Sequence, residues 1–195
     1  MWLKSRRPLA LLVAAGVSQG CVSVHAPLKA DENFPPAWGE LTSLGPECKA
    51  LNGAYLNQGA TAAADGRHEP VSLTSVLNIR SDARIVSLGV RTRRVDENGD
   101  AFVTLRITPD GDNAAPKERE GCFCIKGTLA CTQVSEASWG MPYVYFGGSQ
   151  SNVYFSMTSQ RALVAKLQNY RADVIIVMPI FGMQEPWVRF ERANQ

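Results

Sequence analysis

Cysteine is the residue type in this chain with the widest range of possible chemistry. The sequence contains five cysteines: Cys21, Cys48, Cys122, Cys124 and Cys131. A cysteine side chain can form a disulfide, bind a metal, attack a substrate or carry a lipid. If the chain is exported, an odd number leaves one thiol without a disulfide partner. We therefore expect one of the five to have a role of its own.

The other reactive residue types form no catalytic pattern. His68 stands in a polar stretch beside Glu69, which is typical of a solvated loop residue. The serines after Cys21 form no Gly-x-Ser-x-Gly elbow, and the chain has no Cys-x-x-Cys motif. We predict no catalytic residue and no cofactor, and therefore a non-enzymatic protein.

Two sequence patterns each resemble part of a known metal site but lack a residue that the site requires. Cys122, Cys124 and Cys131 have no fourth ligand at a characteristic spacing, which favours disulfides over a thiolate site. The acidic residues at 96–100 are spaced like the start of a calcium loop, but Ala101 replaces the required glycine. We predict no metal site.

The N-terminus has the features of an export signal. Lys4, Arg6 and Arg7 precede an uncharged, mostly apolar run at 8–17, and small residues lead to Cys21. A membrane-spanning helix needs roughly 20 apolar residues, and this run is too short. We therefore predict that residues 1–20 are a signal peptide.

The end of this signal resembles a bacterial lipobox. In lipoprotein precursors the cysteine after the signal is lipidated, and residues 17–21 match with Gly20 before Cys21, although Ser18 replaces the usual leucine. The resemblance implies a lipid anchor on Cys21. Because Val22 is not aspartate, it also implies sorting to the outer membrane, facing the periplasm. The alternative is ordinary signal cleavage after Ala26.

Composition indicates one domain of nearly neutral charge. The formal net charge is +2, and three of the basic residues lie in the signal. A nucleic-acid partner is therefore not indicated. Residues 21–46 have little apolar periodicity and several prolines, which predicts a tether. We assign residues 47–195 to a single β-rich domain.

Strand and turn signals follow along this domain. Residues 48–57 are interpreted as a first strand, and 71–77 as a short helix capped by Ser72 or Thr74. Apolar, β-branched runs on either side of Asn98-Gly99 then predict a hairpin with a two-residue turn. In that register Val90 faces Ile107.

A second hairpin predicts how the cysteines pair. With Lys126-Gly127 as the turn, Cys122 lies opposite Cys131, where Cα atoms approach to about 4.5 Å. This separation suits a disulfide and leaves Cys124 for Cys48. The alternatives are a bulged turn that shifts the register, and thiols that are buried but not bonded.

Aromatic residues gather in the last third of the chain. Residues 143–146 and 153–157 flank a polar Gly-rich stretch, which predicts a third hairpin that brings Tyr145 close to Tyr154. Together with Tyr143, these tyrosines are the candidate contacts for an apolar ligand or a protein partner. Core packing is the alternative role.

The final segments complete an all-β pattern. Residues 161–170 fit either a helix or a strand, 174–178 read as one buried strand, and 187–190 as the last strand. The fold class is therefore mainly β, a single antiparallel β-barrel or sandwich of about eight strands with one or two short helices.

Three short motifs resemble a group of small proteobacterial lipoproteins. They are Cys-x-x-Leu-x-Gly-x-Tyr-x-Asn at 48–57, Cys-x-x-Gly-x-Leu at 124–129 and Trp-x-Arg-Phe at 187–190. The resemblance implies an outer-membrane lipoprotein, and the absence of catalytic motifs favours an envelope interaction or structural module. The Gly53-x-Tyr55 step also resembles the Gly-x-Trp of lipocalins, which implies the alternative of a carrier for a lipid or other apolar molecule.

The lipid anchor predicts where the protein fractionates. We expect Cys21→Ser to release the chain from carbonate-washed membranes into the soluble periplasmic fraction, because the acylated side chain is lost. Immunoblots of the two fractions test this. Unchanged retention of the variant would rule out Cys21 as the anchor, and a soluble wild-type protein would indicate cleavage after Ala26.

Overall fold

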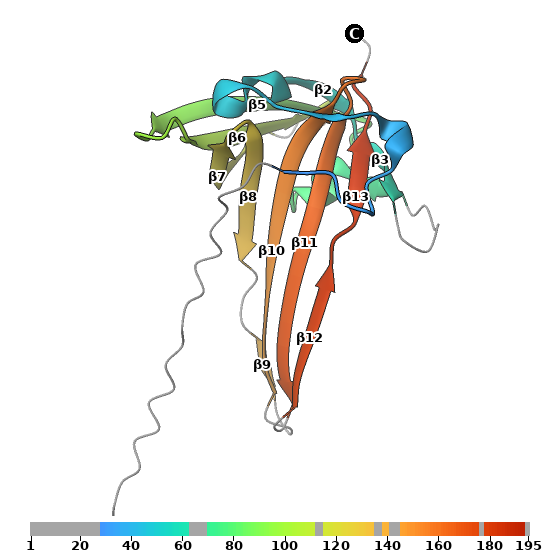
Figure 1. Ribbon diagram of the computed structural model, residues 1–195, viewed down its shortest axis with the longest axis vertical. Helices are drawn as coiled ribbons and strands as arrows, with labels where there is room; N and C mark the ends of the chain where they lie inside the picture. The colour runs from blue at the N-terminus through green and yellow to red at the C-terminus, as the bar shows by residue number, and fades with distance from the viewer. Residues whose placement is uncertain are drawn as a thin grey trace, which may run out of the picture.

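A single curled sheet makes up most of the protein. The computed structural model describes residues 28–62, 70–111, 115–134, 138–140, 145–175 and 178–193. In these residues an antiparallel sheet curls into a half-barrel (Figure 1). The predicted mainly β, antiparallel fold is confirmed. The predicted signal, Cys21 and Tyr143 lie outside the described residues, so the signal and the lipid anchor remain predictions.

The sheet contains more strands than predicted because several are very short. Ten strands follow one another in the order β2-β5-β6-β7-β8-β10-β11-β13-β3-β4, while β1 and β9 pair with β10, and β12 pairs with β11. The strands are β1 (Leu41–Thr42), β2 (Gly53–Leu56), β3 (Gln58–Ala62), β4 (Val71–Ser72), β5 (Ile85–Val95), β6 (Ala101–Pro109), β7 (Lys117–Ile125), β8 (Thr128–Val134), β9 (Ser138–Gly140), β10 (Tyr145–Thr158), β11 (Leu163–Ile175), β12 (Met178–Gln184) and β13 (Trp187–Phe190). The helical segments are η1 (Pro36–Trp38), η2 (Pro46–Leu51) and α1 (Leu73–Val76).

The β5–β6 hairpin has a longer loop than the predicted two-residue turn. The Asp96 carboxylate accepts hydrogen bonds from two backbone amides of the loop at 96–100, each at 2.9 Å. Val90 therefore pairs with Leu105, and the predicted pairing with Ile107 is wrong by two residues. The longer loop and a register shift between Thr92 and Arg94 together make up this difference. Because side chains alternate with a period of two, the residues of β5 before that shift still lie on their predicted face.

The β7–β8 hairpin has the predicted register. Cys122 pairs with Cys131, and the turn residues Lys126 and Gly127 have φ angles of 48° and 76°. Positive φ at both central residues matches the twist of the flanking strands. The hairpin therefore places a lysine in a conformation that lysine disfavours.

Two disulfides connect the cysteines in the predicted pairs. Cys122–Cys131 closes the β7–β8 hairpin with a Cα–Cα distance of 4.2 Å, and Cys48–Cys124 spans 5.7 Å. All four residues are buried. Cys48 lies in η2 and not in a strand, so the predicted first strand is wrong at its start. The second disulfide consequently ties a helical segment to β7.

The predicted third hairpin does not form, and one long strand takes its place. β10 continues through the Gly-rich stretch, where Gly147 pairs with Asp173 and Ser149 with Arg171. Further along, β10 also pairs with β8 on its other side. Pairing with a long neighbouring strand therefore outweighs the local turn propensity of the Gly-rich stretch.

The segments after β10 are also longer strands than the sequence indicates. Residues 161–170, which fitted a helix or a strand, contain the start of β11. The run 174–178 is not one strand: it contains the end of β11 and the first residue of β12, and Ile175 pairs with Met178. The last predicted strand, at 187–190, is confirmed as β13.

The buried side-chain amide of Asn57 connects two segments of the chain that follow it. Asn57 Oδ1 accepts from the backbone N–H of Thr74 at 3.0 Å, and Asn57 Nδ2 donates to the carbonyl of Ala83 at 2.8 Å. Just before it, the Tyr55 hydroxyl donates to the carbonyl of Leu51 at 2.8 Å. The motif at 48–57 therefore has a structural role, since its polar groups join η2, β2 and α1.

The short helix at 71–77 is confirmed, with β4 preceding it. The Ser72 side chain accepts a hydrogen bond from the backbone N–H of Ser75 at 3.1 Å and so acts as the N-cap. This is one of the two predicted caps. α1 contributes the buried Leu73 to the core.

The predicted tether lies against the sheet over most of its length. In residues 28–46, which we call the strap, Phe34 and Leu44 are buried, and β1 pairs with β10. The Leu28 backbone N–H donates to Thr128 Oγ1 at 3.0 Å. Residues from Leu28 onward therefore pack against the domain that was predicted to begin at residue 47. Irregularly spaced apolar residues among prolines have no periodicity that would reveal this packing.

The two disulfides predict unequal losses of stability. Removing Cys48–Cys124, which closes a loop of 76 residues, should lower the free energy of unfolding by about 4 kcal/mol, against about 2.5 kcal/mol for the 9-residue loop of Cys122–Cys131. The longer loop restricts the unfolded chain more. Urea unfolding of the two paired Cys→Ala variants measures both. Equal losses would contradict this account.

Candidate functional site

The structure does not bring Tyr145 and Tyr154 together as predicted. Tyr145 and Tyr154 lie nine residues apart in the same strand, about 30 Å at the usual rise per residue. Tyr154 is buried in the body of the domain, and Tyr143 lies outside the described residues. The expectation failed because it depended on the third hairpin.

A group of charged side chains holds the strap to the sheet. Lys166 Nζ, from β11, lies 2.6 Å from Asp31 Oδ2 of the strap and 2.7 Å from Glu185 Oε2. Trp187 Nε1, from β13, donates to the other oxygen of Asp31 at 2.9 Å. We call these four residues the clamp. It joins three segments that are far apart in the sequence.

The clamp favours the charged forms of its members. Burial disfavours the charge on Lys166, but hydrogen bonds to Asp31 and Glu185 outweigh it, so the pKa of Lys166 is raised. Burial likewise opposes the charge on Asp31, and hydrogen bonds from Lys166 and Trp187 outweigh it, so the pKa of Asp31 is lowered. A lysine held in its charged form is not a nucleophile. The clamp is therefore suited to fastening the strap and not to catalysis.

Aromatic packing continues the clamp on the same side of the sheet. The Phe34 ring lies edge-on to Trp187, with ring centroids 4.9 Å apart, and edge-on to Trp38 at 5.9 Å. Val164 completes a small apolar cluster there, separate from the main core. This packing covers the side of β11 and β13 that faces the strap.

The main core fills the other face of the sheet. Leu105, Phe155 and Phe190 are all fully buried in one apolar cluster that draws on most strands of the half-barrel. Gly59 lies so close to Phe190 that an added Cβ would come within 2.5 Å of the ring. The interior of the half-barrel is therefore occupied by side chains.

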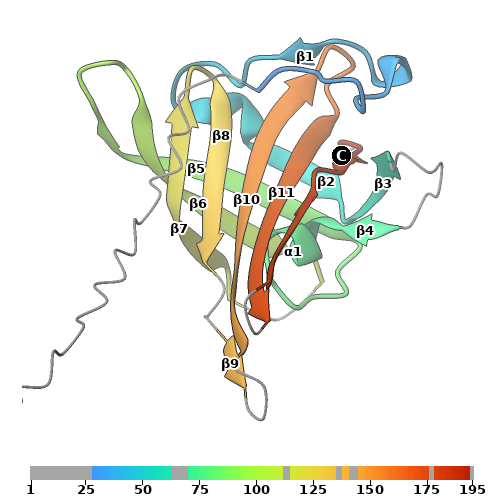
Figure 2. The ribbon, with the colours of Figure 1, turned by 60° about the horizontal axis from the view of Figure 1, so that its bottom comes forward.

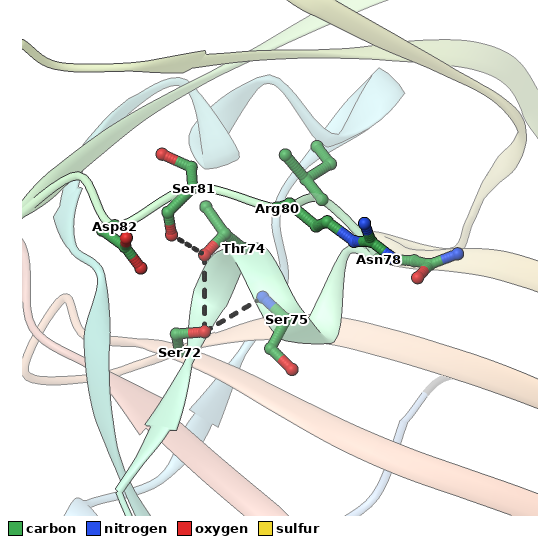
Figure 3. A pocket seen from close by; sticks show the side chains of 8 residues that line it. Ser72, Thr74, Ser75, Asn78, Arg80, Ser81 and Asp82 are labelled. Carbon is green, nitrogen blue, oxygen red and sulfur yellow. Dashed lines mark hydrogen bonds between the residues drawn. The ribbon is translucent and has the colours of Figure 1, made fainter. Parts of the chain in front are cut away.

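A polar hollow of about 600 Å³ lies beside α1 (Figure 3). Its hydroxyls serve the local fold: Thr74 Oγ1 lies 3.4 Å from Ser72 Oγ and 3.2 Å from the carbonyl of Ser81. These hydrogen bonds join β4 and the start of α1 to Ser81. The lining residues are Ser72, Thr74, Ser75, Asn78, Ile79, Arg80, Ser81 and Asp82.

One buried cation has no partner in the part of the chain that the structure describes. Both terminal nitrogens of Arg119, on β7, are buried without a hydrogen bond. Arg119 pairs with Leu105, so both residues lie on the core face of the sheet. Burial lowers the pKa of the guanidinium. An anionic group placed beside Arg119 would supply hydrogen-bond acceptors to its two buried terminal nitrogens.

Within the residues that the structure describes, no three His, Cys, Asp or Glu side chains gather as metal ligands. No helix there is long and apolar enough to cross a membrane. Comparison with protein-family models, curated proteins and solved structures finds no match to any of them.

Sequence reasoning missed the clamp, although one signal for it was present. Lys166 interrupts an apolar stretch that becomes a buried strand, and a lysine in such a position requires a carboxylate partner. The partner, Asp31, lies 135 residues earlier, in a segment that was interpreted as a tether. Nothing local indicates that the two residues meet.

The clamp predicts how stability depends on pH. Asp31→Asn should lower the free energy of unfolding by about 1–2 kcal/mol at neutral pH, because the charged hydrogen bond to Lys166 is lost. The contribution of Asp31 is present above its ordinary pKa of 3.8 and is lost as pH falls through the lowered folded value. For Lys166 the contribution is complete below 10.5 and is lost as pH rises past the raised folded value.

Urea unfolding across the acid range checks this expectation. The difference between wild type and Asp31→Asn should shrink as Asp31 of the wild type becomes protonated. Glu32→Gln, which removes the same charge from an exposed neighbouring residue, is the control and should leave stability nearly unchanged. Equal effects of both substitutions would show that the clamp contributes nothing.

Proposed function

We propose that this protein is an exported lipoprotein, anchored to the outer membrane through Cys21 and facing the periplasm. In this proposal it acts without catalysis, as an interaction or structural module of the cell envelope. The observation that carries the choice is the filled half-barrel: its interior holds packed side chains such as Phe155 and Phe190, both fully buried. A carrier needs that space for its ligand.

The disulfides support an oxidising compartment. Both connect buried cysteines, and such bonds persist in exported proteins while reduction disfavours them in the cytosol. With four cysteines paired, Cys21 is the remaining one, as the lipid anchor requires. In this proposal the clamp also determines how the domain is oriented relative to the anchor, because it fastens the strap, which follows Cys21, to the sheet.

In this proposal the interaction surface is the long ladder of β10, β11 and β12. The distal end of this ladder, with β9, extends beyond the rest of the described chain (Figure 1). A projecting ribbon of few strands is only marginally stable by itself, so contact with another surface would stabilise it. The ladder therefore supports an interaction module more than a self-contained carrier.

A single observation favours the alternative, a carrier of an apolar molecule. The unpartnered guanidinium of Arg119 lies on the core face and would suit the carboxylate of an amphiphile. The dense packing around the neighbouring Leu105, which is fully buried, weighs against a ligand of any size. We therefore rank the carrier second.

Native mass spectrometry separates the two functions. The chain from residue 22 onward, exported to the periplasm behind an ordinary cleavable signal, should show its bare mass, short of the reduced chain by the hydrogens of two disulfides. A reproducible extra mass that leaves on gentle activation, and that Arg119→Met abolishes, would overturn the module in favour of the carrier. Arg106→Met, an exposed arginine of β6, is the matched control.

A further inference from the structure

The distal part of the long ladder is a β-ribbon with unlike faces. We call the arm the part made of β9, residues 145–150 of β10, residues 170–175 of β11 and β12. The pairings place Phe146 beside Val174, and Tyr170 beside Gln150. Because neighbouring residues of a strand lie on opposite faces, register alone assigns each position of the arm to one of two faces.

One face of the arm is apolar by sequence and has no charged position. We call it the outer face; besides Gly148, Gln150, Ala172 and Pro179, its positions are Trp139, Phe146, Tyr170, Val174, Phe181 and Met183. The opposite face has the two charged positions of the arm, Arg171 and Asp173, together with Ser149. Only its last row, with Tyr145, Ile175 and Met178, is apolar. The arm is therefore amphipathic along its length and apolar on both faces at its end.

In the arm, the apolar positions lie on the side of the sheet opposite to the side that forms the main core in the rest of the domain. Counting along β10 and β11, the outer face of the arm continues the side on which Lys166 and Val164 meet the strap, and not the core side of Phe155. In the body the strap covers this side. In the arm no described element does so, because the arm extends past the body (Figures 1 and 2).

The position of the N-terminus indicates what lies against this face. The strap begins at Leu28, whose backbone N–H is bonded to Thr128, on the strap side of β8. Cys21 is only seven residues earlier, so a lipid on Cys21 would keep Leu28 within about 25 Å of the membrane surface. An anchor there draws the strap side of the domain, and with it the outer face of the arm, toward the bilayer.

We propose that the arm is a second membrane contact, which lays its outer face on the surface of the lipid bilayer and dips its apolar end into the interface. This inference rests on the proposed lipid anchor and deepens it. Trp139 and Tyr170 are residue types that favour the membrane interface, and the charged positions at 171 and 173 stay on the watery side.

The unpaired edge strands of the arm limit how deeply it can enter the lipid bilayer. Among the described residues β12 pairs with β11 alone, and β9 with β10 alone, so each keeps one row of backbone groups without a strand partner. Such groups are not tolerated in the hydrocarbon core. The arm therefore lies along the interface, where water reaches its edges, and does not span the membrane.

Vesicle binding by the unlipidated protein tests this contact without the anchor. The chain from residue 22 onward should co-sediment reversibly with vesicles of phosphatidylethanolamine and phosphatidylglycerol. Phe146→Ser with Phe181→Ser should weaken the partition coefficient roughly tenfold per phenylalanine, because each loses an apolar ring from the interface. The control pair, Ser149→Ala with Ser151→Ala on the opposite face, should bind like the wild type.

A fluorescence measurement keeps the test valid if the substituted arm folds poorly. In the unsubstituted chain, brominated lipids should quench tryptophan emission, and Trp139→Phe should remove most of the quenching, since Trp38 and Trp187 lie in the body.

Three results would overturn the membrane contact. They are failure of the unsubstituted chain to bind vesicles, quenching that persists in Trp139→Phe, and a dimer in solution that the two phenylalanine substitutions dissociate. None of these bears on the anchor, which the fractionation of Cys21→Ser tests separately.

Discussion

The uninterrupted pairing of β10 with β11 is the constraint on which the rest of the structure depends. The ladder runs from Met157 and Leu163 in the body to Tyr145 and Ile175 at the far end without a bulge. Because an antiparallel ladder transmits its register over its whole length, the order of faces in the body determines the order in the arm. The same two strands thus complete the main core, receive the strap and build the projecting ribbon.

The two sides of this ladder are stabilised by different physical means. On the core side, apolar side chains from β10, β11 and β13 pack with η2, β2 and α1, and two disulfides restrict the unfolded chain. On the strap side, a few charged and aromatic residues around Lys166 and Trp187 hold a segment that has almost no regular structure. Directional contacts fasten the strap where packing area alone is small.

This division would suit the proposed attachment of the protein to a membrane by its N-terminus. A flexible tether would leave the domain free to rotate, whereas a strap fixed by the clamp would give the domain a defined side toward the proposed anchor. The orientation of the half-barrel and of the arm then follows from where the strap is attached. In the proposed function, the clamp therefore positions the interaction surface rather than forming it.

Local signals predicted what depends on neighbouring residues. The β7–β8 register followed from a Lys-Gly turn between two short, mostly apolar runs, and with it the pairing of Cys122 with Cys131. The cap of α1 and the final strand were also predicted, because caps and alternation act over a few residues. The lipobox-like stretch before Cys21 is likewise a local pattern, and its role remains a proposal.

Only the tertiary structure decided the features that depend on distant partners. The Gly-rich stretch at 147–149 has the composition of a turn, but pairing with β11 makes it part of a strand. The strap has the composition of a linker, but Asp31 meets Lys166, 135 residues away, and Phe34 meets Trp187. The sequence by itself determined the fold class and the cysteine pairs; the long ladder, the clamp and the arm arose from long-range pairing, whose free energy outweighs local preference.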